Sequence, residues 1–235
     1  MNRLSRGAVT RSVLAGGVLL AALAVPLAAG PGAAAKGGGD FASIFTDGSL
    51  VGAGWAGCPT AVIWDADVSA LSPKAAKFAL QDLEWAIGTW AAAGGIAVQK
   101  GAEGQLSYDN SSATVAGVPG GRKLFVKFVK DDESDYLSGR VVGVATPTKV
   151  IASAPEITGG SAAFRTDYVE YASKTEARAL LLHELGHAFG LGHSNDKKSV
   201  VYPIVGKTIK LSAGDIAGIR AFTKNCDPSL DPQRG

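Results

Sequence analysis

The run His183-Glu184-Leu185-Gly186-His187-Ala188-Phe189-Gly190-Leu191-Gly192-His193 contains all three histidines of the 235-residue sequence. Residues four apart share one face of an α-helix, so a helix here points the imidazoles of His183 and His187 at one place. Gly190 lets the chain leave that helix in a left-handed conformation, and the turn brings His193 round. Three imidazoles with a fourth position open are a ligand set of catalytic zinc. The spacing therefore predicts a zinc ion held by His183, His187 and His193.

Glu184 follows the first predicted ligand directly, where it reaches water at the metal without being a ligand. A carboxylate in this place can act as a general base for the attacking water and then return the proton to the leaving amine. A purely structural zinc normally has four protein ligands and needs no base. The pattern therefore favours a hydrolase in which Glu184 is catalytic. Two alternatives stay open: a zinc-stabilised extracellular binding module without turnover, and a zinc hydrolase of cell-wall amide bonds.

The pattern HExxHxxGxxH is that of the metzincin metalloproteases, and its surroundings resemble the matrixins among them. Tyr202-Pro203 follows His193 at the distance at which matrixins have a Met-Tyr-Pro turn. Residues 211–219 are similar to the start of the last matrixin helix. Residues 141–147 and 159–164 are similar to strands that precede the family's zinc helix. The resemblance spans roughly residues 58–226. It implies a secreted, bacterial-type zinc endopeptidase with an α+β fold: a twisted mixed β-sheet, a long first helix, a zinc-binding helix and a C-terminal helix.

The chain departs from the family at the turn. Val201 stands where matrixins have a methionine beneath the zinc ligands, and valine is shorter and stiffer but removes no ligand. The family's second, structural zinc needs further histidines, and none is left, so we expect one zinc per chain. The resemblance also implies a protein or peptide substrate extended along an exposed sheet edge. It assigns to the substrate pocket four residues, Val201, Tyr202, Pro203 and Val205, and we expect this pocket to prefer an apolar side chain.

The first 35 residues are typical of a secretory signal peptide. They combine three arginines, an apolar stretch over residues 13–27 and Ala33-Ala34-Ala35 as a cleavage site. The apolar stretch is too short for a confident membrane span, so we expect no stable membrane anchor. Residues 36–57, rich in glycine and small side chains, are predicted to be a flexible lead-in. Residues 58–235 are then the catalytic domain of an extracellular protein, which we expect to be a monomer.

Charge argues against a nucleic-acid partner. Three of the 23 basic side chains, Arg3, Arg6 and Arg11, lie in the predicted signal peptide, which leaves 20 basic against 21 acidic side chains. A nucleic-acid-binding protein needs a basic surface to contact phosphates.

The apolar pattern predicts further elements. Ser72-Pro73 is a helix start, apolar residues recur at helical spacing to Trp90, and Gly94-Gly95 stops the helix. Capping boxes are predicted for the zinc helix, at Ser173 and Glu176, and similarly for the last helix, at Ser212 and Asp215. Strands are predicted over residues 61–68, 96–99, 124–129, 141–145 and 162–164.

Two further features concern cysteines and carboxylates. Cys58 and Cys226 bracket the predicted catalytic domain, and an even count in a secreted chain favours a disulfide between them. The alternative is that Cys58 binds the zinc as a latency switch.

The acidic cluster Asp131, Asp132, Glu133 and Asp135 offers oxygen ligands for calcium, although a solvated acidic loop is the favoured interpretation.

Overall fold

The structure is a computed structural model of the chain. It describes residues 41–44, 54–55, 61–102, 122–130, 133, 137, 139–151 and 156–223, without the side chains of 148–151. The chain divides into two units, residues 1–30 and 31–235, and every described residue belongs to the second.

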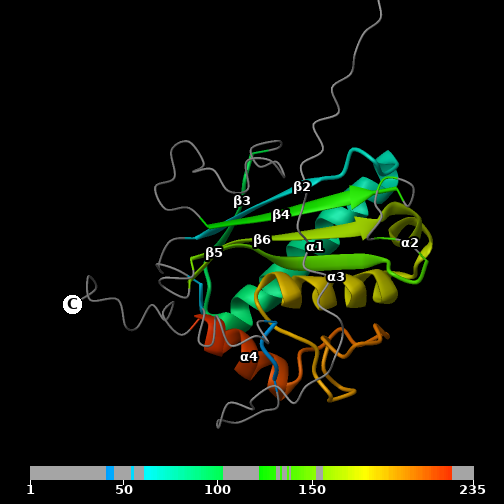
Figure 1. The fold of residues 1–235 in the computed structure, drawn as a ribbon. Helices are drawn as coiled ribbons and strands as arrows, with labels where there is room; N and C mark the ends of the chain where they lie inside the picture. Colours follow the sequence, from blue (N-terminus) through cyan, green and yellow to red (C-terminus); the bar gives the residue numbers. More distant parts are fainter. Residues whose placement is uncertain are drawn as a thin grey trace, which may run out of the picture. The chain divides into compact units, whose positions relative to one another are not determined.

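Within these residues the strands form one mixed sheet (Figure 1). The strands are β1 (Gly54–Trp55), β2 (Val62–Asp67), β3 (Val98–Lys100), β4 (Arg122–Val129), β5 (Gly143–Ile151) and β6 (Glu156–Arg165). Their order is β1-β6-β4-β2-β3 with all neighbours parallel, and β5 pairs antiparallel with β6. This arrangement confirms the predicted mixed sheet.

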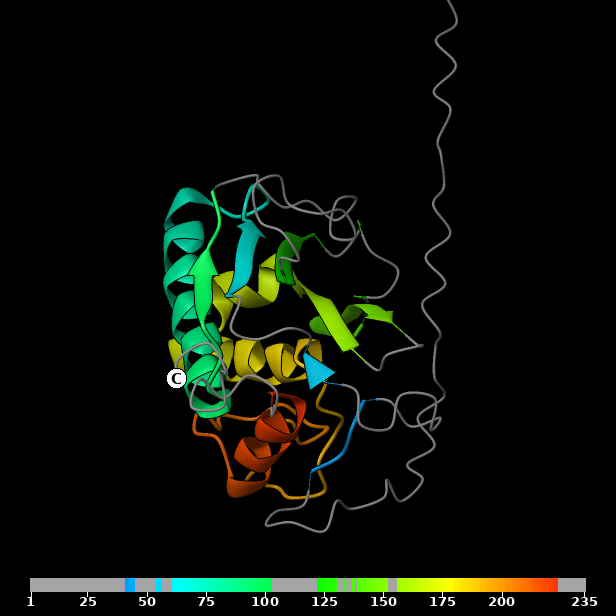
Figure 2. The ribbon, with the colours of Figure 1, turned by 90° about the vertical axis from the view of Figure 1, so that its left-hand side faces the viewer.

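Four helices are described: α1 (Pro73–Gly94), α2 (Thr166–Tyr171), α3 (Lys174–Ala188) and α4 (Ala213–Thr223). Figure 1 and Figure 2 together show α1 and α3 on one side of the sheet and α4 beyond α3. The long first helix, the histidine-bearing helix and the last helix are thus all present. None of the described helices is both long and apolar enough to cross a bilayer.

The helix ends follow the predicted signals with one difference. Gly95 ends α1 in a left-handed conformation (φ 65°), and Pro73 begins it. Ser173 and Glu176 form the full capping box of α3. The Ser72 side chain, however, makes no capping bond; its backbone N–H donates instead to Glu170 Oε1 at 2.9 Å.

Strand β6 is longer than the sequence pattern predicts, because Gly159 and Gly160 interrupt the apolar run. A Cβ on Gly160 would lie 2.8 Å from the carbonyl oxygen of Ala188 at the end of α3. The glycine is therefore a place of close helix–sheet approach. Strand β1 and helix α2 lie outside the elements that the sequence pattern predicts.

The core lies between the sheet and α1, α3 and α4. Fully buried aromatic side chains of distant segments meet there: Trp55 contacts Phe189, and Phe128 stacks on Phe164. Trp90 of α1 donates its indole N–H to the carbonyl oxygen of Leu182 in α3 at 2.9 Å. This bond links α1 to α3 and gives the buried indole N–H the partner that a buried polar group needs.

Two pieces of the predicted lead-in contact the folded body. Ser43 forms an antiparallel bridge with Leu191. The Ile44 N–H donates to the Gly190 carbonyl at 2.9 Å, and the Gly192 N–H donates to the Ala42 carbonyl at 2.8 Å. The other piece is strand β1. Residues 41–44 therefore lie along the turn that carries the third histidine.

Candidate metal centre

The three histidines converge as their spacing predicts. His183 and His187 lie one turn apart on α3, and both are buried. His193 follows the helix and is the least buried of the three. One ring nitrogen from each residue lies within 4.8 Å of the other two. Imidazole nitrogens at this spacing can share one metal ion.

The turn between His187 and His193 depends on Gly190. Gly190 has a φ of 110°, a conformation that strains other residues. The Leu191 N–H donates to the Gly186 carbonyl, and the Gly190 N–H donates to the His187 carbonyl. These two bonds are the pair that defines a Schellman ending. The α3 helix therefore ends where the third histidine can turn back towards the first two.

Backbone carbonyls fix which ring nitrogens face the site. His183 Nδ1 lies 2.9 Å from the Val200 carbonyl, and His187 Nδ1 lies 2.7 Å from the Leu191 carbonyl. A carbonyl accepts only, so each Nδ1 carries the proton, and each Nε2 presents a lone pair. The two Nε2 atoms are 3.1 Å apart. Two lone pairs this close repel each other unless a cation lies between them.

These distances fit zinc. Two nitrogens at about 2.05 Å from a tetrahedral zinc lie about 3.3 Å apart, close to the observed 3.1 Å. The Nδ1 bonds to carbonyls are the outer contacts that orient histidine ligands at metal sites. His183, His187 and His193 would hold the ion.

Burial sets the protonation of the site. It lowers the pKa of His183 to about 4 and of His187 to about 3, and it also lowers the pKa of His193. The histidines are therefore neutral at physiological pH, as metal ligands must be. Without a metal ion, burial raises the pKa of Glu184 to about 8. A cation held by the histidines would lower this pKa again and favour the ionised carboxylate that a general base needs. A buried carboxyl with a strongly shifted pKa, beside a cluster of candidate metal ligands, is typical of a functional site.

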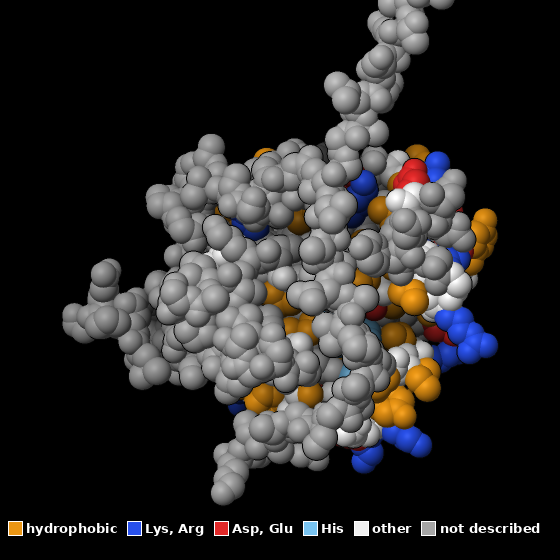
Figure 3. Space-filling view, in the orientation of Figure 1, with side chains coloured by type: hydrophobic (Ala, Val, Ile, Leu, Met, Phe, Trp, Pro, Cys, Tyr) orange, Lys and Arg blue, Asp and Glu red, His pale blue; other side chains and the backbone are white. Residues whose placement is uncertain are grey.

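The turn after His193 supports α3 from below. Val201 is buried. Gly186 lies between the two histidines of α3 in the sequence, and a Cβ on Gly186 would lie only 2.6 Å from Val201 Cγ1. Tyr202 and Val205 are half-buried, and Pro203 is exposed. Of the four residues assigned to the pocket, Val201 thus packs under the helix. In the view of Figure 3, small areas of histidine side chain are visible beside hydrophobic side chains.

The sequence pattern predicts Asp215 only as a capping residue. In the structure, its buried carboxylate also accepts hydrogen bonds from Ser199 Oγ and from the Val200 N–H. Val200 is the residue whose carbonyl orients His183. Asp215 therefore connects α4 to the metal centre through one residue.

Several sequence predictions fall outside the described residues, namely those on Cys58, Cys226, Asp131, Asp132 and Asp135. Glu133 is described, and it accepts a hydrogen bond from the Lys130 N–H within its own turn.

The chain matches known proteins over this region. The matrixin family model matches residues 85–223, more than half of the chain. A macrophage metalloelastase of Oryctolagus cuniculus is 42% identical over 70 residues, which cover 27% of this chain and 15% of the relative. Matrilysin of Homo sapiens is 50% identical over 42 residues (16% of each chain), and metalloendoproteinase 1 of Glycine max is 37% identical over 51 residues (20% and 17%). Each match spans less than a fifth of the relative's length. With three histidines on a helix and its following turn, above a turn that ends in Tyr-Pro, this chain belongs to the matrixins.

Proposed function

We propose that this chain is a secreted zinc-dependent endopeptidase that hydrolyses peptide bonds with Glu184 as general base. The observation that carries the proposal is the convergence of the three histidine nitrogens next to a buried carboxyl that is not needed as a ligand. Family membership supports it, because the matched relatives are named as metalloproteinases or elastases.

The residues divide the chemistry between them. When bound, zinc supplies a Lewis acid that acidifies water and polarises the scissile carbonyl. His183, His187 and His193 would hold the ion, and the Val200 and Leu191 carbonyls keep the rings of the two helix histidines in place. Glu184 takes a proton from the attacking water and delivers it to the leaving amine.

Strand β5 is the proposed site for the substrate backbone. In the described sheet it pairs only with β6, so its second edge is open to an extended peptide. Val144 of this strand is exposed, and the half-buried Tyr202 and Val205 follow Val201. These side chains support a preference for an apolar substrate residue.

The test is to incubate the protein, purified without residues 1–35, with a diverse peptide library, with and without a chelator. We expect chelator-sensitive cuts at internal peptide bonds. If the zinc-loaded protein cuts no peptide, it is a binding module instead. If it cuts only amide bonds of cell-wall material, it is a different hydrolase.

The remaining predictions for the whole chain belong to the same proposal. Residues 1–35 are a secretion signal, and the mature protein is a monomer with one zinc. The calcium site at the acidic cluster stays a prediction, because Glu133, the one described residue of that cluster, accepts its hydrogen bond from within its own turn. Zinc content per chain and the mass in solution test the stoichiometry.

A disulfide between Cys58 and Cys226 is also proposed. The support for it is that β1 and α4 lie close together: a Cβ on Gly54 would lie 2.9 Å from the Phe222 carbonyl oxygen. Cys58 comes four residues after Gly54, and Cys226 comes four residues after Phe222. Four residues reach at most about 14 Å, so the bridge needs no rearrangement of β1 or α4. Thiol labelling before and after reduction tests it: labelling without a reductant would contradict the bridge.

A further inference from the structure

Gly143, the first residue of β5, has no room for a side chain. A Cβ there would lie 2.7 Å from Cγ, 2.8 Å from Oε1 and 2.9 Å from Cδ of Glu184. Real side chains do not approach this closely. The φ of Gly143 is not positive, so its backbone would suit other residues. The glycine is therefore required for space and not for conformation.

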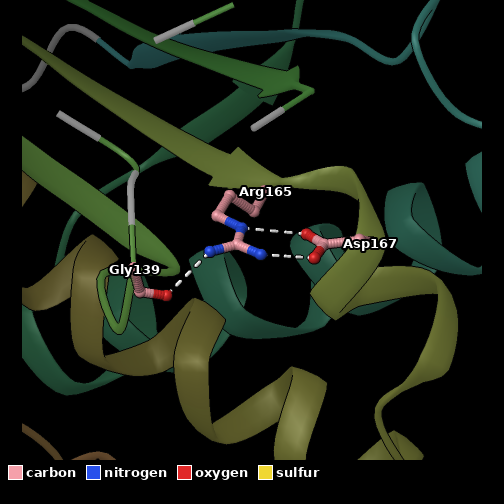
Figure 4. A network of polar contacts seen from close by, with 3 residues as sticks. All are labelled: Gly139, Arg165 and Asp167. Atoms are coloured by element: carbon pink, nitrogen blue, oxygen red, sulfur yellow. Dashed lines mark hydrogen bonds and ion pairs between the residues drawn. The ribbon is translucent and has the colours of Figure 1, made fainter. Parts of the chain in front are cut away.

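Strand β5 is held in place on both sides of this contact. Gly143 pairs with Phe164 of β6, and the Arg165 N–H donates to the Val142 carbonyl at 3.0 Å. The Arg165 guanidinium donates to the Gly139 carbonyl at 2.9 Å and forms an ion pair with Asp167 (Figure 4). The turn that leads into β5 is thus fixed as well. An added side chain at residue 143 would therefore press on the Glu184 side chain, which supplies the three atoms nearest to the added Cβ.

Packing is what places the Glu184 carboxylate. Within the described part of the chain, no hydrogen bond holds this carboxylate, and burial alone shifts its pKa. Its backbone is fixed in α3 between two histidines. The position of its oxygens is then decided by the surfaces that they touch, and the Gly143 backbone is one of these.

We propose that Gly143 is a positioning residue that seats the Glu184 carboxylate against the start of β5, next to the metal centre. The inference rests on the proposed role of Glu184 as general base. The same strand is the proposed site for the substrate backbone. The contact between Gly143 and Glu184 would therefore link the position of the general base to the strand that would hold the peptide.

The first test is the Gly143→Ala variant. Displacing a catalytic group by about 1 Å can lower a rate by about 10²-fold. We expect kcat on a cleaved peptide to fall by about that factor, with KM and zinc content close to those of the wild type. Gly88→Ala is the matched control, because a Cβ at residue 88 meets nothing within 4 Å. Its kcat should not change. An unchanged kcat in Gly143→Ala would overturn the proposal.

A second test does not depend on activity. The unfolding midpoint of the metal-free protein is measured for the wild type, Gly143→Ala, Glu184→Ala and the double variant. If the contact is real, Gly143→Ala lowers the midpoint in the presence of Glu184 and has no such effect in the Glu184→Ala background, where the space is empty. Equal effects in the two backgrounds would contradict the contact. A wild type without peptidase activity would contradict the proposed function, while this cycle still decides the contact.

Discussion

At the scale of single residues, hydrogen bonds from two ring nitrogens and burial prepare the site for a cation. The Val200 and Leu191 carbonyls leave the Nε2 lone pairs of His183 and His187 facing each other at 3.1 Å. Burial lowers the pKa of both rings, so protonation does not relieve this repulsion at neutral pH. A cation held by both rings would remove this repulsion.

This arrangement predicts how the stability of the metal-free protein depends on pH. The unfolded chain binds protons at its histidines below about pH 6.5, whereas folded His183 and His187 bind them only near pH 4 and 3. Their contribution to stability is therefore complete above about pH 6.5 and is lost as the pH falls towards 4. Each contributes a slope of up to about 1.4 kcal/mol per pH unit. Denaturant titrations of the metal-free protein at a series of pH values, from neutral to mildly acidic, measure this change in the free energy of unfolding.

Glu184 contributes with the opposite sign. Its folded pKa is raised to about 8, so the folded state retains a proton that the unfolded state loses above about pH 4.3. Its contribution to stability therefore grows as the pH falls and offsets part of the histidine slope. In Glu184→Gln the decline below about pH 6.5 should be steeper than in the wild type. Parallel profiles would show that the folded carboxyl titrates normally.

At the scale of elements, α3 is held by partners at both ends and along its buried face. The capping box of Ser173 and Glu176 begins it, Trp90 of α1 bonds to its Leu182 carbonyl, and Gly190 ends it. From α4, the buried Asp215 accepts hydrogen bonds from Ser199, Val200 and Ser212. Because the Val200 carbonyl contacts His183 Nδ1, the last helix is connected to the candidate metal centre.

We therefore predict that Asp215→Ala weakens both the fold and metal binding. The change leaves buried donors without an acceptor, which should lower the free energy of unfolding by about 2–5 kcal/mol. Loss of an outer contact should weaken zinc binding by about 10-fold to 100-fold. Chemical denaturation and competition with a zinc indicator measure the two effects.

Ser212→Ala is the control for that prediction. It removes the hydrogen bond from the Asp215 N–H to Ser212 Oγ at the start of α4 but leaves the bonds to Ser199 and Val200. Its cost should be about 1 kcal/mol, with zinc affinity unchanged. If both variants weaken zinc binding equally, Asp215 acts by stabilising α4 and not by anchoring the turn.

At the scale of the whole molecule, the features that the sequence predicts are those with a local cause. Helix α1, the caps of α3 and the turn at Gly190 depend on residues a few positions apart, so local sequence patterns predict them. The contact of Gly143 with Glu184, the bond from Val200 to Asp215 and the bridge of Ser43 to Leu191 join distant segments. No local pattern marks such pairs, because they depend on how the sheet and helices pack.

Peptide hydrolysis by Glu184→Gln, with zinc content determined on the same sample, tests the proposed role of Glu184 most directly. Glutamine keeps the size of the side chain but cannot act as a base, and all three histidines remain. We expect one zinc per chain, an unchanged fold and a rate lower by a factor of about 10² to 10⁴. A zinc-loaded variant that cleaves peptides at the wild-type rate would contradict the role of Glu184 as general base.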